Sequence, residues 1–134
     1  MPSARKTPLR VVKAAAPVYQ LRIELDDVRP AVWRRLQVSG AVKLHKLHVI
    51  LQHTMGWCGG HLHEFIIGGQ NYGIPDPDFP GGPSVRREDR VTLAAALGVS
   101  RSFRYLYDFG DGWEHHIKLE KTLAPEPGLP PPLC

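Results

Sequence analysis

The sequence of 134 residues lacks the features that mark several classes of protein. It has no apolar run of about 18 residues, which excludes a membrane-spanning helix. The first 17 residues contain no apolar run of signal-peptide length. Its two cysteines, Cys58 and Cys134, are too few for a disulfide framework. We therefore expect a cytoplasmic protein with no membrane partner.

Common catalytic and nucleotide-binding motifs are also missing. No glycine pattern opens a helix directly after a strand, which excludes a Rossmann fingerprint and a P-loop. There is no His-Glu-x-x-His or Cys-x-x-Cys pair to indicate zinc, and no Gly-x-Ser-x-Gly turn to carry a nucleophilic serine. The sequence therefore names no catalytic residue and does not decide whether the protein is an enzyme.

The basic residues are unevenly distributed. The chain has 17 Lys and Arg against 13 Asp and Glu, and four of the basic residues lie in residues 1–17, which contain no acid. The remaining chain therefore has 13 basic and 13 acidic residues. A nucleic-acid-binding domain carries its basic excess on the folded part. The charge pattern favours a basic disordered leader over residues 1–17, with weak attraction to phosphate as the alternative.

Hydrophobic periodicity predicts the order of elements. Alternating apolar and polar residues predict strands over residues 19–25, 32–38, 61–67, 103–109 and 113–119. Apolar spacings of three and four predict a helix over residues 44–55, ended by Gly56. A second, short helix is expected between Asp89, its predicted N-cap, and Gly98.

Strands joined as hairpins beside a helix are typical of an α+β domain. We predict one domain over residues 18–123, with a small, mostly antiparallel sheet, one main helix packed on one face and a second short helix. Residues 68–83 are rich in Gly and Pro and are expected to form a loop. Residues 124–134 are expected to form a Pro-rich extended tail.

One set of polar residues has the donor types that a divalent metal such as zinc prefers. The candidate ligands are His61, His63, Asp108, Asp111 and His115. We expect His63 to meet the turn that contains the two aspartates. We favour a structural role, in which His63 bonds to a carboxylate or a backbone carbonyl, because aspartates in such turns accept backbone hydrogen bonds and buried histidines have polar partners.

A second set of residues is a candidate binding surface: Arg29, Trp33, Arg35 and Tyr107. We expect Trp33 to be mostly buried, with an arginine stem packed along it and the guanidinium group paired to Asp108 or Asp111. Aromatic side chains at strand spacing also suit the stacking of bases, but the absence of a basic surplus on the same sheet favours core packing.

Several segments together resemble a known family. They include Arg29-Pro-Ala-Val-Trp-Arg-Arg-Leu, Leu44-His-Lys-Leu-His, His61-Leu-His-Glu-Phe and Tyr107-Asp-Phe-Gly-Asp-Gly-Trp-Glu-His. In order and spacing, residues 18–121 resemble the plasmid pRiA4b ORF-3-like family, also described as passenger proteins of insertion elements. The resemblance implies an α+β fold and an association with plasmids and mobile elements. It implies no catalytic residues, because the family has no established activity.

The sequence departs from this family at its C-terminus. Family members usually continue with a Cys-rich or acidic segment and a further helix, whereas this sequence ends at Pro130-Pro-Pro-Leu-Cys134. We expect either a short member or a truncated chain.

Two functions follow from the sequence. The first is a non-enzymatic accessory or binding protein of mobile DNA, with a protein or nucleic-acid partner. The second is a metal-dependent enzyme of the hydrolase type that uses the His and Asp set.

Overall fold

The computed structural model describes residues 16–57, 62–75, 85–107 and 112–125. Of the predicted leader and tail, the structure describes residues 16–17 and 124–125 alone. His61, Asp108 and Asp111 lie outside the described residues. No helix in the described part of the chain is long and apolar enough to cross a membrane.

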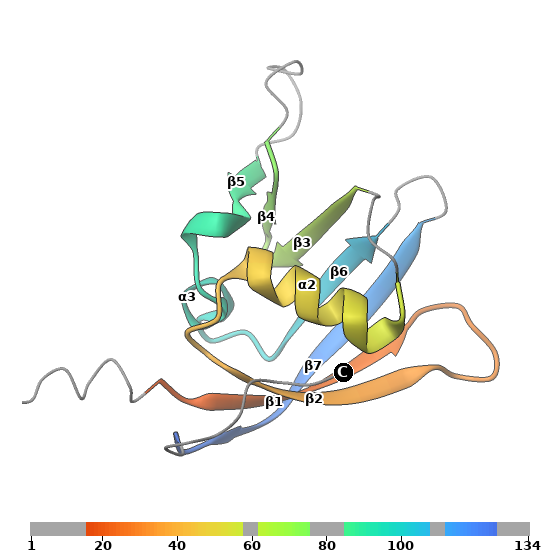
Figure 1. Cartoon of the computed structure of the whole chain (residues 1–134), viewed down its shortest axis with the longest axis horizontal. Coiled ribbons are helices and arrows are strands. Elements are labelled where there is room, and N and C mark those ends of the chain that lie inside the picture. Colours follow the sequence, from red (N-terminus) through yellow and green to blue (C-terminus); the bar gives the residue numbers. More distant parts are fainter. Residues whose placement is uncertain (1–15, 58–61, 76–84, 108–111, 126–134) are drawn as a thin grey trace, which may run out of the picture.

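The described residues form an α+β structure around one sheet (Figure 1). The strands are β1 (Val18–Leu25), β2 (Trp33–Ser39), β3 (His63–Ile67), β4 (Gln70–Gly73), β5 (Val85–Arg87), β6 (Ser102–Tyr107) and β7 (Trp113–Leu123). The helices are α2 (Leu44–Met55), the 3₁₀ turn η1 (Glu88–Arg90) and α3 (Leu93–Leu97).

The sheet has seven strands in the order β2-β1-β7-β6-β3-β4-β5, so it is larger than the small sheet that we predicted. The β4–β5 pair is parallel, and the other described pairs are antiparallel. The mostly antiparallel sheet and its hairpin between β1 and β2 are therefore confirmed. Strands β2 and β5 form the two edges of the sheet.

Helix α2 lies in front of β3, β6 and β7 in Figure 1. Its buried leucines, Leu44, Leu47 and Leu51, belong to the same hydrophobic cluster as Leu21 and Phe65 of the sheet. The helix ends where the sequence predicts, because Gly56 adopts a left-handed conformation with φ of 78° and its N–H bonds to carbonyl oxygens of the last turn.

The structure corrects two predictions between α2 and β6. The expected loop over residues 68–83 contains β4, which follows β3 through a tight turn at Gly68 and Gly69, where φ is 58° and 79°. The short helix begins at Leu93, with Thr92 rather than Asp89 as its N-cap. The hydroxyl oxygen of Thr92 accepts a hydrogen bond from the N–H of Ala95, which caps the first turn of α3.

Candidate functional site

The candidate metal ligand His63 forms a buried pair with a carboxylate that the sequence analysis did not single out. Its Nε2 lies 2.7 and 2.9 Å from the two carboxylate oxygens of Glu88, in η1. Because a carboxylate accepts, Nε2 donates to it. The two side chains are 7% and 6% exposed. The prediction that a structural His63 bonds to a carboxylate is confirmed, although the partner comes from η1.

A second histidine packs directly on this pair. The rings of His48, from α2, and His63 are stacked, with centroids 3.5 Å apart. The Nδ1 of His48 lies 2.6 Å from the hydroxyl of Tyr105, which also accepts a hydrogen bond from Gln52. Burial is the main reason that the pKa of His48 falls to about 4, and the neighbouring His63 lowers it further. The imidazole of His48 is therefore neutral at pH 7.

His115 is fully buried on β7 and both of its ring nitrogens have partners. Nδ1 lies 3.0 Å from the carbonyl oxygen of Tyr105 and donates to it, and Nε2 accepts from the indole N–H of Trp57 at 3.1 Å. Burial lowers the pKa of His115 and favours the neutral ring. These contacts are those of a structural histidine.

The described residues contain no group of three or more His, Cys, Asp or Glu side chains arranged to hold a metal. His63 and His115 are engaged with different partners. The other proposed ligands, His61, Asp108 and Asp111, lie outside the described residues. Strand pairing does set His63 opposite Tyr107, the residue before Asp108.

Replacing His115 with leucine tests its role. We expect the free energy of unfolding to fall by about 1–3 kcal/mol, because buried polar partners in Trp57 and Tyr105 lose their hydrogen bonds. Urea unfolding with and without added zinc measures the change. The matched control is His116→Leu on the opposite face of β7, where we expect a smaller loss. A zinc-dependent gain in stability that disappears in His115→Leu would instead make His115 a metal ligand.

The other candidate surface lies on β2, β1 and β7, on the sheet face turned away from α2. Trp33 is 38% exposed, and the guanidinium carbon atoms of Arg22 and Arg35 lie 4.0 and 5.2 Å from its ring centroid. Arginine packing on Trp33 is confirmed, but the prediction that Trp33 is mostly buried is wrong. As the first residue of an edge strand, Trp33 has a neighbouring strand on one side alone among the described residues.

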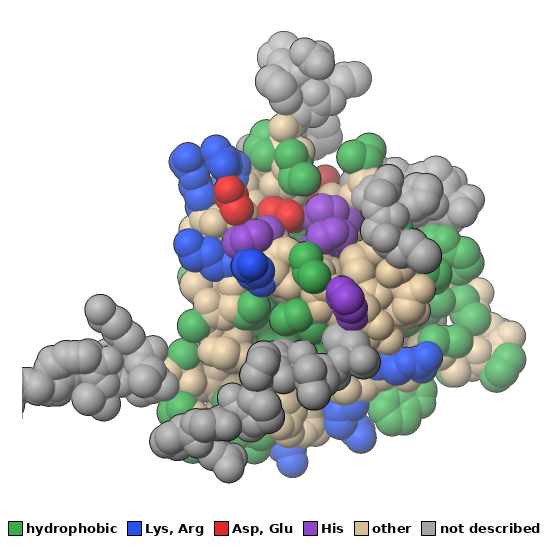
Figure 2. Space-filling view, viewed as in Figure 1, with side chains coloured by type: hydrophobic (Ala, Val, Ile, Leu, Met, Phe, Trp, Pro, Cys, Tyr) green, Lys and Arg blue, Asp and Glu red, His purple; other side chains and the backbone are tan. Residues whose placement is uncertain are grey.

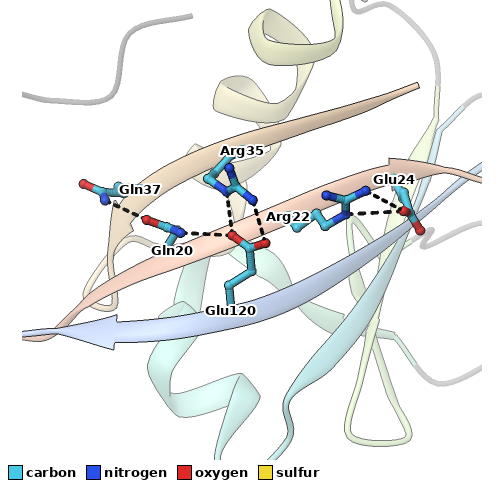
Figure 3. A network of polar contacts seen from close by, with 6 residues as sticks. All are labelled: Gln20, Arg22, Glu24, Arg35, Gln37 and Glu120. Carbon is cyan, nitrogen blue, oxygen red and sulfur yellow. Dashed lines mark hydrogen bonds and ion pairs between the residues drawn. The ribbon is translucent and has the colours of Figure 1, made fainter. Parts of the chain in front are cut away.

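The guanidinium groups pair with acids other than the predicted ones (Figure 3). Arg35 donates to both carboxylate oxygens of Glu120, at 2.7 and 3.0 Å, and Arg22 donates to Glu24. The hydrogen bond from Arg35 is the main reason that the pKa of Glu120 falls to about 2. A sequence pattern does not reveal this pair, because 85 positions separate its members.

Two amides continue the network along the same face. Gln20 donates to Glu120 at 3.0 Å and accepts from Gln37 at 2.9 Å. We call the seven residues of this network and its tryptophan the Trp33 surface: Gln20, Arg22, Glu24, Trp33, Arg35, Gln37 and Glu120.

The remaining candidate binding residues divide between surface and core. Arg29 is exposed and precedes Pro30 through a cis peptide bond. Tyr107 is 4% exposed and stacks on Trp57, so it belongs to the core and not to the Trp33 surface.

An α+β sheet with a buried pair of His63 and Glu88 and a polar outer face defines the class of the protein by its fold and not by a reaction. Residues 17–134 match the model of the family described as plasmid pRiA4b ORF-3-like protein. The chain belongs to this family, as its sequence motifs indicate.

Two similar proteins extend the comparison. The chain is 46% identical over 109 residues to the uncharacterized protein y4hQ of Sinorhizobium fredii (strain NBRC 101917 / NGR234), covering 80% of this chain and 55% of that protein. The chain thus spans about half the length of this relative. The crystal structure of the protein of unknown function MM3350 from Methanosarcina mazei Go1 has a TM-score of 0.77 and 32% identity, covering 89% of this chain and 68% of that one.

Proposed function

We propose that this chain is a non-enzymatic binding module and that the Trp33 surface binds a protein partner. The observation that carries the proposal is an exposed tryptophan packed against two arginines on an edge strand. Tryptophan and arginine are enriched among the residues that contribute most to protein interfaces. The arginines hold the indole ring in place, which lowers the entropy lost when a partner covers it.

The charge of this face favours a protein over a nucleic acid. Arg22 pairs with Glu24 and Arg35 with Glu120, so the two cations beside Trp33 are already neutralised. Nucleic-acid binding draws its affinity from cations that neutralise phosphates. A balanced set of donors and acceptors instead suits the mixed polar rim of a protein interface.

Strand β2 adds a backbone contribution to the proposed surface. It pairs with β1 on one side and stands at the end of the described sheet, so its outer edge carries backbone groups suited to an added strand. Exposed Trp33 and Arg35 lie on this strand. We propose that an extended segment of the partner binds along β2, with Trp33 as the main side-chain contact.

The family description supports a biological setting for this module. We propose that the protein is a cytoplasmic accessory protein of plasmids or other mobile DNA, as the description "plasmid pRiA4b ORF-3-like" suggests. The metal-dependent enzyme is the alternative, and the zinc experiment on His115 tests it.

Photo-crosslinking in living cells tests the proposed surface. A photoreactive aromatic residue, p-benzoylphenylalanine, replaces Trp33 in one variant and Val99, which is 99% exposed, in a control variant. We expect a discrete protein to crosslink from position 33 and not from position 99. The adduct should diminish when Arg35→Ala is added. Identical adducts at both positions, or an adduct at position 33 that nuclease removes, would contradict the proposal.

A further inference from the structure

A cavity of about 520 Å³ lies near the β5 edge, far along the sheet from the Trp33 surface. Its lining comes from four elements and one adjoining segment: His45 of α2, the end of β4 with residues 74–75, and residues 87–89 of β5 and η1. A volume of this size is typical of small-molecule sites. The cavity is separate from the surface on which the proposed function rests.

One histidine that lines the cavity has a ring nitrogen without a partner among the described residues. The Nδ1 of His45 is buried and forms no hydrogen bond with the described residues. Buried polar atoms in native proteins nearly always have a partner, and a bound molecule that reached this nitrogen would supply one. Glu88, which is 5% exposed, also lines the cavity. Its carboxylate accepts from His63 and has lone pairs left for a second donor.

The charges of the lining favour a cationic group over an anionic one. Arg87 donates to both carboxylate oxygens of Asp89, at 3.1 and 2.8 Å, so its charge is directed at that carboxylate. Among the Arg, Asp and Glu side chains of the lining, Glu88 then leaves one more negative than positive charge. Figure 2 shows acidic and histidine side chains gathered on this side of the molecule, with Lys and Arg side chains beside them. The carboxylate of Glu88 is buried, which strengthens its attraction for a nearby cation.

We infer that this cavity binds a small ligand with a primary ammonium group and a short aliphatic part. An ammonium group has three N–H donors, and the cavity offers three kinds of acceptor for them: Glu88, Asp89 and the Nδ1 of His45. Ile74, which is 71% exposed, and Pro75 provide an apolar wall for the aliphatic part. In this arrangement Nδ1 of His45 accepts, and the ring proton lies on Nε2.

An NMR titration of the isotope-labelled full chain at pH 7 tests the inference, with n-butylamine as the probe. The controls are n-butanol and butyrate, which share the aliphatic part and replace the ammonium group with a neutral or an anionic one. We expect n-butylamine to cause saturable shifts in the amide signals of His45, Ile74 and Asp89. We expect n-butanol and butyrate to cause much smaller shifts.

Two substitutions that each remove one negative charge distinguish binding in the cavity from binding elsewhere on the surface. Asp89→Asn removes an exposed carboxylate of the cavity, and Asp26→Asn removes one that pairs with Arg104 elsewhere. We expect n-butylamine to bind Asp89→Asn about tenfold more weakly and Asp26→Asn as it binds the unaltered chain. Shifts that do not saturate, equal binding of n-butanol or butyrate, or equal weakening by both substitutions would overturn the inference.

Discussion

Replacing His63 with alanine is expected to lower the free energy of unfolding by about 3–5 kcal/mol. The substitution leaves the buried carboxylate of Glu88 without the N–H group that lies 2.7 Å from it. It also removes the ring on which His48 stacks. Urea unfolding at pH 7, followed by circular dichroism, measures the loss.

The neighbouring ion pair of Arg87 and Asp89 provides a matched control. Its side chains are 50% and 42% exposed, so water replaces the lost contact when Arg87 becomes alanine. We expect a much smaller change in Arg87→Ala than in His63→Ala. Equal changes in the two variants would contradict a structural role for the buried pair.

Stability is expected to fall between pH 7 and pH 4 through His48, by roughly 1–2 kcal/mol because solvent screens the half-buried ring. The unfolded chain takes up a proton at the ordinary histidine pKa of 6.5, whereas the folded chain resists protonation until pH is about 4. The contribution of neutral His48 is therefore complete above pH 6.5 and is lost as the pH falls toward 4. The depressed pKa of buried His115 acts in the same direction.

Urea unfolding at several pH values between 7 and 4 measures this dependence, with His48→Gln as the comparison. Glutamine does not titrate, so the variant should lose less stability over this range. Glu120 affects the curve at lower pH, because its pKa falls from 4.5 to about 2 in the folded chain. Parallel curves for the two proteins would contradict the assignment to His48.

Local patterns predicted much of the sheet and the main helix. The alternation in β1 places Leu21 and Ile23 in the core, and both are fully buried. The apolar spacing in α2 likewise agrees with its buried leucines. These elements could be predicted because in each of them the apolar side chains face the core and the polar side chains face the solvent.

Strand β4 was missed although its turn was visible in the sequence. Gly68 and Gly69 both have positive φ, the geometry that joins hairpin strands through two residues. We interpreted these glycines as part of a longer Gly- and Pro-rich loop. The four residues of β4, Gln70–Gly73, are too short and too polar at their start to show an alternating pattern.

The contacts of the candidate sites could not be predicted for a different reason. Glu88 meets His63 across 25 positions, and Glu120 meets Arg35 across 85. The first pair depends on where η1 packs, and the second on the order of β2, β1 and β7 in the sheet. The periodicity of a sequence indicates the face of a strand or helix on which a side chain lies, but it does not indicate which residue that side chain contacts.

The affinity of the crosslinked partner for the purified chain tests the central claim most directly. Calorimetric titrations compare the unaltered chain with Trp33→Ala and with Val99→Ala, an exposed control far from β2 in the sequence. If the Trp33 surface binds the partner, Trp33→Ala weakens binding by about thirtyfold, the loss typical of a central tryptophan, and Val99→Ala leaves it unchanged. Equal affinity of Trp33→Ala and the unaltered chain would contradict the account.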